Sequence, residues 1–389
     1  MIVECLKLRD FRNYGELELR PHPGINLLFG QNGSGKTNLL EAVHYCALGR
    51  SHRTSQDREV VRKGCDASAV GVTVARNTGR HEIAVKLMPN GIKRKQVFVD
   101  RKRAIRLSDM MGRLQCVIFS PEDLMLVKDG PALRRRFLDM MLSQMSTAYF
   151  LALQQYQKAL DQRNALLRDA RKTGRMNIAL MDAFEQGMAE HSEMIVRQRK
   201  RIIDQLARVA GDKYGAISGR EQELFALNYR ACLPDSTDFV TKAREILVKT
   251  RQEDMLRGTT SFGVHREDMD LLLMGRDMKL FASQGQIRTA VLSMKLAQME
   301  IFQQESGEEP VLLLDDVMSE LDMTRRKRLL QEISHVQTFV TCTDESDLDG
   351  CGEKRTYLVS MGTDGLAAVK EKNAGETVRK AEEEEPNFE

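Results

Sequence analysis

Residues 25–37 read Ile25-Asn26-Leu27-Leu28-Phe29-Gly30-Gln31-Asn32-Gly33-Ser34-Gly35-Lys36-Thr37, an apolar run that enters a glycine-rich loop. The loop matches the pattern G-x-x-x-x-G-K-[ST], and apolar residues at helical spacing follow it as far as Gly49. Glycines let the backbone turn so that successive N–H groups face phosphate oxygens, and the positive end of the next helix adds to the attraction. The segment therefore predicts a phosphate site in which Lys36 reaches the β- and γ-phosphates of ATP and Thr37 holds Mg²⁺.

A second set of candidate residues lies where an apolar run ends in two acids. Val311-Leu312-Leu313-Leu314 has the character of a buried strand, and Asp315 and Asp316 follow it directly. Asp315 suits a Mg²⁺ position reached through water, and Asp316 suits a group that polarises an attacking water. Such junctions are also common at ordinary strand ends, so the interpretation depends on two companions, Ser283-Gln284-Gly285-Gln286 upstream and Ser319-Glu320-Leu321-Asp322 downstream.

These motifs together resemble the ATPase head of the ABC class. The SQGQ segment is similar to that class's signature loop, LLLDD to its Walker B strand and SELD to its D-loop. The resemblance implies that ATP is bound between two heads, with catalytic roles for Lys36, Asp316 and Ser283. It also implies that Ser283, Gly285 and Gln286 act on the nucleotide of the opposite protomer.

Two departures from the ABC pattern bear on activity. Transporters carry Glu where this chain has Asp316, which is one methylene shorter, so we expect slow turnover. Many ABC heads carry a switch His after the next strand, whereas this chain has no His there and leaves Thr341 or Thr343 as candidates for that contact. The counterpart of the Q-loop is expected near Ser120-Pro121-Glu122, although the nearby Gln115 precedes the strand.

The head motifs come from both ends of the chain, because 247 residues separate Lys36 from Ser283. We predict an α/β fold, a P-loop ABC-type ATPase head with a mixed sheet, flanking helices and an inserted α-helical second lobe. The expected parts are the head at residues 1–125 and 256–370, the inserted lobe at 126–255 and an acidic disordered tail at 371–389.

In the predicted insertion, an apolar residue recurs at every seventh position. A companion series of positions at the same spacing is partly polar, because it includes His191 and Gln198. This pattern favours a packed helical hairpin over a long coiled coil. The repeating residues are Met181, Met188, Ile195, Ile202 and Val209.

Several longer stretches resemble one branch of the ABC class, the bacterial RecF family of recombination and repair proteins. They include LRDFRNYGELEL, LGRSHRT, FSPEDLMLVKDGPALRRRFLD, SFGVHREDMDLLL and SQGQIRTAVLSMKLA, and the resemblance covers residues 1–370. It implies a weak DNA-linked ATPase that uses ATP and Mg²⁺ and forms an ATP-dependent homodimer. It also implies binding to double-stranded DNA and to junctions between single- and double-stranded DNA. The resemblance implies recombination mediators of the RecR/RecO type as partners. It also implies that the protein helps to load a recombinase and supports replication and the SOS response.

An alternative function stays open at this point. An SMC-like structural or switch ATPase would organise chromosome or replisome contacts, with hydrolysis incidental. A transporter ATPase is disfavoured by the large helical insertion.

Composition narrows the class of protein. The chain has 389 residues with 59 Lys and Arg against 56 Asp and Glu, for a net charge of +3. The tail at 371–389 contributes −4, which leaves +7 on residues 1–370 and permits an anionic partner. Seven cysteines without a CxxC pair favour reduced thiols, and no apolar run is long enough to span a membrane, so we expect a cytoplasmic protein.

Clusters of Lys and Arg are candidate contacts for DNA phosphates, although each could also be an ordinary solvated face. Few aromatic residues lie among them, which favours duplex backbone contact over base stacking. Arg50 and Arg53 are expected to face nucleotide or DNA, and the role of His265-Arg266, nucleotide contact or fold support, is open. The clusters lie at residues 93–95, 101–103, 134–136, 168–175 and 197–201.

Overall fold

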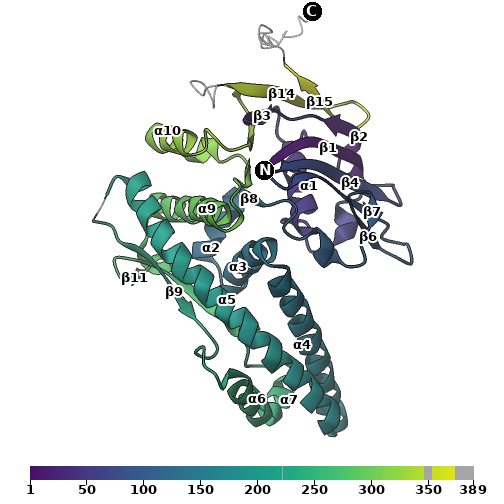
Figure 1. The fold of residues 1–389 in the computed structure, drawn as a ribbon, viewed down its shortest axis with the longest axis vertical. Coiled ribbons are helices and arrows are strands. Elements are labelled where there is room, and N and C mark those ends of the chain that lie inside the picture. Colours follow the sequence, from purple (N-terminus) through teal and green to yellow (C-terminus); the bar gives the residue numbers. More distant parts are fainter. Residues whose placement is uncertain (221, 346–352, 373–389) are drawn as a thin grey trace, which may run out of the picture.

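The computed structural model describes residues 1–220, 222–345 and 353–372. It has a mixed α/β head and an elongated second lobe that extends from it (Figure 1). Most of the predicted acidic tail, from residue 373 onward, lies outside the described residues, and its first residue, Glu371, belongs to the last strand. No helix in the described part of the chain is long and apolar enough to cross a membrane.

A six-stranded sheet carries the phosphate loop and the paired acids. Its order is β15-β14-β3-β13-β12-β8, and every neighbouring pair except β14–β15 is parallel. Both faces are covered, which explains why the inner strands read as continuous apolar runs. The strands are β3 (Ile25–Phe29), β8 (Cys116–Phe119), β12 (Val311–Leu314), β13 (Thr338–Cys342), β14 (Lys354–Met361) and β15 (Ala367–Glu371).

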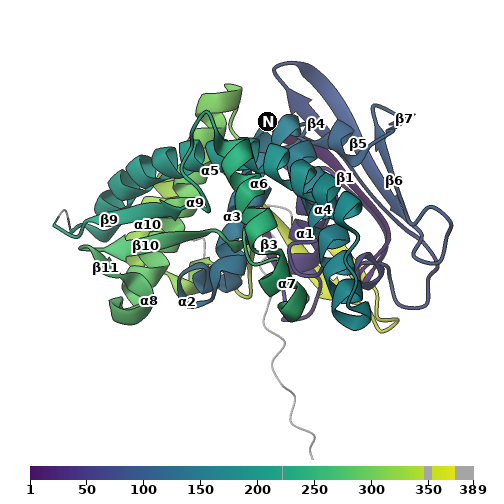
Figure 2. The same ribbon diagram turned by 90° about the horizontal axis from the view of Figure 1, so that it is seen from below.

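A second, antiparallel sheet in the order β2-β1-β4-β5-β6-β7 covers α1 (Lys36–Leu48) from the other side. One buried cluster joins Leu6 of this sheet, Leu40 of α1, and Leu28 and Leu313 of the parallel sheet. Figure 2 shows α1 close to this second sheet. Its strands are β1 (Ile2–Phe11), β2 (Tyr14–Leu19), β4 (Ser68–Arg76), β5 (Gly79–Leu87), β6 (Lys95–Val99) and β7 (Lys102–Arg103).

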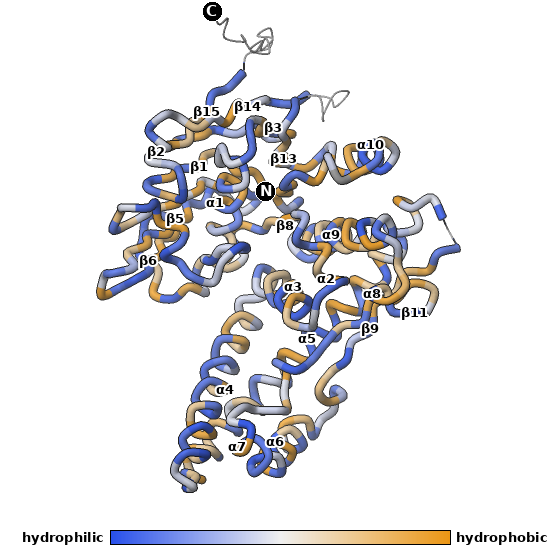
Figure 3. Tube along the Cα trace, turned by 180° about the vertical axis from the view of Figure 1, so that it is seen from behind, coloured by the Kyte–Doolittle hydropathy of each residue, from blue (hydrophilic) through white to orange (hydrophobic). Residues whose placement is uncertain are grey.

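The second lobe is built around the antiparallel helices α4 (Thr147–Thr173) and α5 (Ile178–Ser218), which form a hairpin as the apolar repeat predicted. Four of the five repeat residues are fully buried, and Val209 is partly buried. Apolar residues of α5 and α9 belong to one core that also covers the second face of the parallel sheet, and the hydropathy colouring shows α9 rich in apolar residues (Figure 3). The other helices are α2 (Met125–Lys128), α3 (Pro131–Met145), α6 (Phe239–Lys249), α7 (Arg251–Arg257), α8 (Met278–Phe281), α9 (Gln284–Ser306) and α10 (Met323–Glu332).

The insertion is not purely helical. Strand β9 (Phe225–Arg230) lies inside residues 126–255 and pairs with β10 (Asp268–Leu273), which pairs in turn with β11 (Arg276–Asp277). In β9, Phe225 and Leu227 are buried while Asn228 is exposed, an alternation of period two that the helical interpretation overlooked. Strands and helices from residues 256–306 therefore pack onto the inserted lobe.

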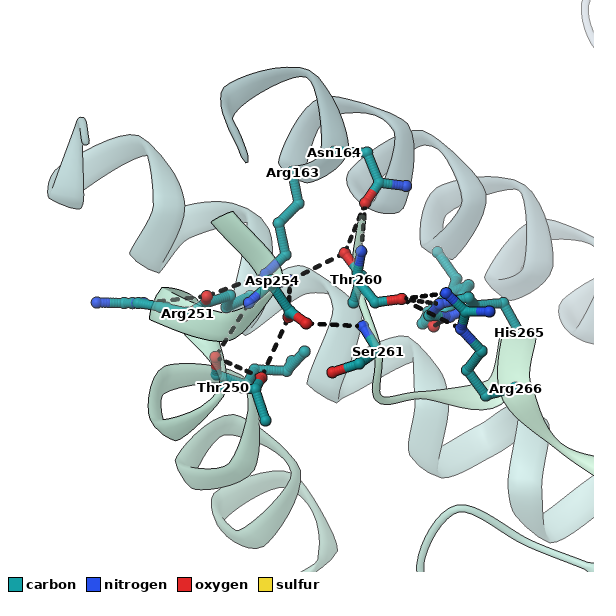
Figure 4. A network of polar contacts seen from close by, with 12 residues as sticks. Arg163, Asn164, Thr250, Arg251, Asp254, Thr260, Ser261, His265 and Arg266 are labelled. Atoms are coloured by element: carbon teal, nitrogen blue, oxygen red, sulfur yellow. Dashed lines mark hydrogen bonds and ion pairs between the residues drawn. The ribbon is translucent and has the colours of Figure 1, made fainter. Parts of the chain in front are cut away.

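A buried arginine joins the helices near the turn of the hairpin (Figure 4). Arg163 of α4 has no exposed surface and donates to Glu185 of α5 at 3.0 Å and to Asp254 of α7 at 2.7 Å. It also donates to the Thr260 hydroxyl at 2.9 Å and to the Leu247 carbonyl at 3.0 Å. One guanidinium thus links helices α4, α5, α6 and α7.

His265 and Arg266 belong to the same network and support the fold (Figure 4). The Tyr156 hydroxyl lies 2.6 Å from His265 Nδ1, while Nε2 lies 3.1 Å from the Thr260 carbonyl, to which Arg266 also donates at 2.8 Å. Burial lowers the pKa of His265 to about 4, so the ring is neutral and donates its single N–H through Nε2.

We predict that Arg163→Ala lowers the free energy of unfolding by about 3–5 kcal/mol, because it leaves the buried Asp254 without its cation and removes one of the two arginines that pair with the buried Glu185. Urea unfolding followed by circular dichroism measures the change. Arg168→Ala, an exposed residue five positions along the same helix, is the matched control and should stay within about 0.5 kcal/mol of wild type. An Arg163 variant as stable as this control would contradict the assignment.

Candidate nucleotide-binding site

The phosphate loop between β3 and α1 turns through three glycines with positive φ angles. Gly30, Gly33 and Gly35 have φ angles of 149°, 79° and 115°. A Cβ on Gly30 would lie 2.1 Å from the Val359 carbonyl oxygen, and one on Gly35 would lie 2.8 Å from the Asn13 amide. Glycine is therefore required at Gly30 by contact with the backbone as well as by conformation, and at Gly35 chiefly by conformation, since the contacting atom belongs to a side chain.

The polar groups of the loop fit an anion. Lys36 Nζ is buried and donates to the carbonyls of Gly30 at 2.7 Å and Gln31 at 3.0 Å, so the ammonium group arches over the loop. The Ser34 hydroxyl is buried without a hydrogen-bond partner among the described residues, while Gln31 and Asn32 are exposed at the rim. A phosphate would supply the acceptor that the Ser34 hydroxyl lacks, and would offer Lys36 an anionic acceptor in place of the loop carbonyls.

Residues from the N-terminal and C-terminal parts of the chain bond to one oxygen atom of Asp315. The hydroxyl of Thr37, in the first turn of α1, donates to Asp315 Oδ1 at 2.8 Å, and the hydroxyl of Thr341 at the end of β13 donates to the same atom at 2.8 Å. Strands β3, β13 and β12 are adjacent and parallel, so their carboxyl ends lie at one edge of the sheet. The register of the sheet therefore places these three side chains together.

The Asp315 carboxyl is poised for a cation. Burial raises its pKa, and the nearby carboxylates of Asp316 and Glu122 act in the same direction, whereas the hydroxyls of Thr37 and Thr341 oppose the shift. A buried carboxylate beside a hydroxyl offers the hard oxygen ligands that Mg²⁺ prefers, and a bound cation would remove the cost of ionising the carboxyl in this position.

Asp316 has an unusual backbone. Its φ is 50°, in the left-handed region that only a few per cent of non-glycine residues occupy. Its N–H donates to the Thr341 hydroxyl at 2.8 Å and its carbonyl accepts from the Ser319 hydroxyl at 2.9 Å. Thr341 thus contacts the backbone of one acid and the carboxylate of the other, whereas nothing in the sequence signals the left-handed turn.

The signature-like loop lies at the exposed start of α9. Ser283 caps the helix: its hydroxyl accepts from the Gln286 N–H at 3.3 Å, and its own N–H donates to the Gln286 side chain at 2.9 Å. Gln286 also donates to Glu223, and Gln284 accepts from Lys128. These bonds connect the loop to its own lobe, and none of them reaches the phosphate loop.

A buried acid on α1 was missed by sequence reasoning. Glu41 has no exposed surface, receives two hydrogen bonds from Arg12 at 2.8 and 2.6 Å, and accepts from the Ser51 hydroxyl. Burial alone would raise its pKa, but Arg12 and Ser51 hold it below the usual value. This pair anchors the segment after α1 and brings Arg53 to 3.1 Å from Asn38, beside Thr37. The pairing joins residues 29 positions apart and leaves no local pattern.

Two of the five basic clusters each contain an arginine that is buried in the fold. In residues 134–136, Arg134 forms a two-bonded pair with Asp268 and the other two arginines donate to backbone carbonyls. In residues 197–201, Arg199 is buried against Asp139 and Glu267, and the flanking cations pair with acids. Interpreting these stretches as free surface was wrong for Arg134 and Arg199, because their charges are neutralised inside the fold.

Comparison with known proteins agrees with this geometry. The family described as "RecF/RecN/SMC N terminal domain" matches residues 2–367. A protein of Ruminiclostridium cellulolyticum named "DNA replication and repair protein RecF" is 38% identical over 351 residues, which is 89% of this chain and 93% of that protein. A relative of the same name from Clostridium novyi is 36% identical over 90% of this chain and 94% of its own length.

Solved structures give the same result. One described as "recombination mediator protein RecF-ATP in RecFOR pathway" has a TM-score of 0.85 and 32% identity, covering 95% of this chain and 97% of its own. Its companion, described as RecF-ATPrS, has a TM-score of 0.84 and 33% identity over 94% and 97%. An Smc head bound to a domain of ScpA shares the fold at a TM-score of 0.56 and 16% identity. The chain therefore belongs to the RecF family, within the larger group that includes RecN and SMC proteins.

Proposed function

We propose that this chain is an ATP-dependent DNA repair and recombination protein. It binds duplex DNA at single-strand gaps, dimerises on ATP and helps load a recombinase, in support of replication and the SOS response. The observation that carries the proposal is the contact of Thr37 with Asp315 across 278 residues, beside a loop shaped for phosphate. Two solved relatives that are described as RecF with ATP or ATPrS support the choice of ligand.

Each residue has a proposed task at the nucleotide. The backbone N–H groups of residues 30–35 cradle the phosphates, and Lys36 swings from the loop carbonyls to the β- and γ-phosphates. Thr37 and Asp315 hold Mg²⁺, which when bound neutralises charge on the phosphates. Asp316 orients the attacking water, while Ser283, Gly285 and Gln286 of a second copy complete the site.

We expect the hydrolysis of ATP to be slow. The Asp316 side chain is short, and its backbone is held by Thr341 in a conformation that costs roughly 1–3 kcal/mol. A carboxylate restrained in this way has little freedom to follow the water. The same observation motivates the second candidate, in which ATP binding alone is the switch and hydrolysis is incidental.

DNA would contact the basic surface that remains after the internal pairs are removed. Residues 93–94 and 102–103 are exposed at the edge of the antiparallel sheet, where Arg101 pairs with Glu82, and Arg171, Lys172 and Arg175 are exposed at the end of α4. Such clusters bind phosphates without reading sequence. The proposed protein partners are mediators of the RecR/RecO type, supported by the RecFOR pathway that the solved relatives' descriptions name.

The shared site predicts rescue between two inactive variants. Lys36→Arg disables the phosphate loop and Ser283→Arg disables the opposing loop, so neither protein alone should hydrolyse ATP. An equal mixture should regain about a quarter of the wild-type rate, because half of randomly formed dimers are mixed and each has one intact site. Phosphate release and sedimentation with ATP are the measurements. Absence of both rescue and ATP-dependent dimers would refute the shared site.

Asp315→Asn should separate stability from nucleotide binding. The raised native pKa means that the ionised carboxyl costs stability at neutral pH, and this cost disappears as the pH falls through the native pKa. The nucleotide-free variant should therefore be at least as stable as wild type at neutral pH, with the difference shrinking in mild acid. Wild type should gain about 2.7 kcal/mol from Mg-ATP at 100 times its Kd, and the variant much less. Urea titrations at both pH values test this, and a variant that retains the full gain would contradict the metal assignment.

DNA binding should show a salt dependence that reports phosphate contacts. Lys172→Ala or Arg175→Ala should lower the slope of log K against log salt by about 1 if each residue binds one phosphate. Fluorescence anisotropy with gapped and blunt duplexes, with and without ATP, measures the slope. Lys200→Ala is the control, since Lys200 pairs with Asp204 at 3.1 Å. Equal slopes for all variants would exclude the end of α4 as a contact.

The switch alternative is tested with Asp316→Asn. If a hydrolysis-deficient Asp316→Asn protein fully restores repair in cells that lack the wild-type protein, the switch function is favoured over the hydrolytic cycle.

A further inference from the structure

An arginine outside the recognised motifs lies against the signature-like loop. Helix α10 (Met323–Glu332) begins directly after the SELD segment, and Asp322 caps it by accepting from the Arg325 N–H at 2.9 Å. The same carboxylate pairs with the Arg325 guanidinium at 2.7 Å. Asp322 therefore fixes both the start of the helix and the direction of the Arg325 side chain.

The guanidinium of Arg325 faces Gly285. A Cβ on Gly285 would lie 3.8 Å from both Nη1 and Nη2. Because glycine has no side chain, nothing separates the two nitrogens from the backbone of the first turn of α9. The side chain of Arg325 keeps 28% of its surface exposed, and Ser283 is exposed two residues before Gly285. The guanidinium, the serine and the helix start thus border one accessible surface.

The chemistry of this surface suits a terminal phosphate. The first turn of the 23-residue helix α9 carries a partial positive charge, and the Ser283 hydroxyl accepts from Gln286 and still has its own O–H to donate. Arg325 adds a full charge and a planar fork of N–H groups that matches phosphate oxygens. Among the described residues, its guanidinium pairs with Asp322, an acid whose side chain is 53% exposed.

We propose that Arg325 contacts the γ-phosphate of the ATP held by the opposite protomer and stabilises the charge that develops during hydrolysis. The proposal rests on the shared site argued above and adds a catalytic residue to it. Water forms a bond to the γ-phosphorus, the bond from that phosphorus to the β–γ bridging oxygen breaks, and ADP and phosphate leave. The proton of the water passes to Asp316 or to solvent. Asp322 is the positioning residue that aims the guanidinium.

A role within its own chain is the competing explanation. Arg325 could brace Asp322 and the SELD segment of the protomer to which it belongs. The two roles differ in the site that they affect. A residue acting in trans serves the partner's phosphate loop, whereas a brace of the SELD segment, whose Ser319 donates to the Asp316 carbonyl, serves the site of its own chain.

Mixing experiments distinguish the two roles. Arg325→Ala should lower kcat about 100-fold, the range seen when one preorganised donor is removed, with little change in KM. Mixed in equal amounts with Lys36→Arg protein, it should regain about a quarter of the wild-type rate. In the mixed dimer the intact phosphate loop of the Arg325→Ala chain faces the intact Arg325 of the other chain. A cis brace gives no such rescue, since the only intact phosphate loop then lacks its own arginine.

Three controls are needed to interpret the mixing experiment. Lys327→Ala removes an exposed cation two residues along the same helix and should leave kcat unchanged. Arg325→Lys keeps the charge without the fork, should retain an intermediate kcat, and replaces the alanine variant if thermal unfolding shows that the latter is misfolded. The Ser283→Arg and Lys36→Arg mixture reports on the shared site itself. Rescue in that mixture without rescue of the Arg325 variant would overturn this proposal alone, as would a kcat within twofold of wild type.

Discussion

Everything at the candidate site depends on one constraint, the parallel pairing of β13 between β3 and β12. Parallel strands point their carboxyl ends the same way, so the loop after β3, the acids after β12 and Thr341 near the end of β13 share one edge. As a result of this pairing, the hydroxyls of Thr37 and Thr341 both donate to Asp315 Oδ1. A slip of one residue in any of these strands would turn the side chains to the opposite face.

The net charge of the chain is a poor guide to its surface. Arg163, Arg134 and Arg199 all carry charges that are neutralised by acids in the interior of the second lobe or at its junction with the head. Buried ion pairs of this kind cost desolvation energy and contribute less to stability than to fixing one arrangement of the helices. The positive surface available to an anionic partner is therefore narrower than the sequence count implies, and it includes exposed cations at the sheet edge and at the end of α4.

Local patterns in the sequence were sufficient to predict the phosphate loop, the acidic strand end and the helical hairpin, since each depends on neighbours in the chain. Strand β9 was missed because its partner β10 begins 38 residues after the end of β9 and its alternation is short. The Arg12–Glu41 pair and the left-handed turn at Asp316 were also missed, because a long-range contact imposes each of them. The roles assigned to Ser283 and Asp316 came from motif resemblance and remain proposals about chemistry between two chains.

The sheet topology also has a consequence for synthesis on the ribosome. Among the described residues, strand β3 pairs only with β13 and β14, and Asn26 bonds to Thr338, 312 residues later. At roughly 5–20 residues per second, an apolar strand with two unpaired edges waits roughly 15–60 s for its partners to emerge. The antiparallel sheet and α1 can cover one face during that time, but the hydrogen-bonding edges stay open until the chain is nearly complete. The nucleotide site is therefore among the last parts of this protein that can form.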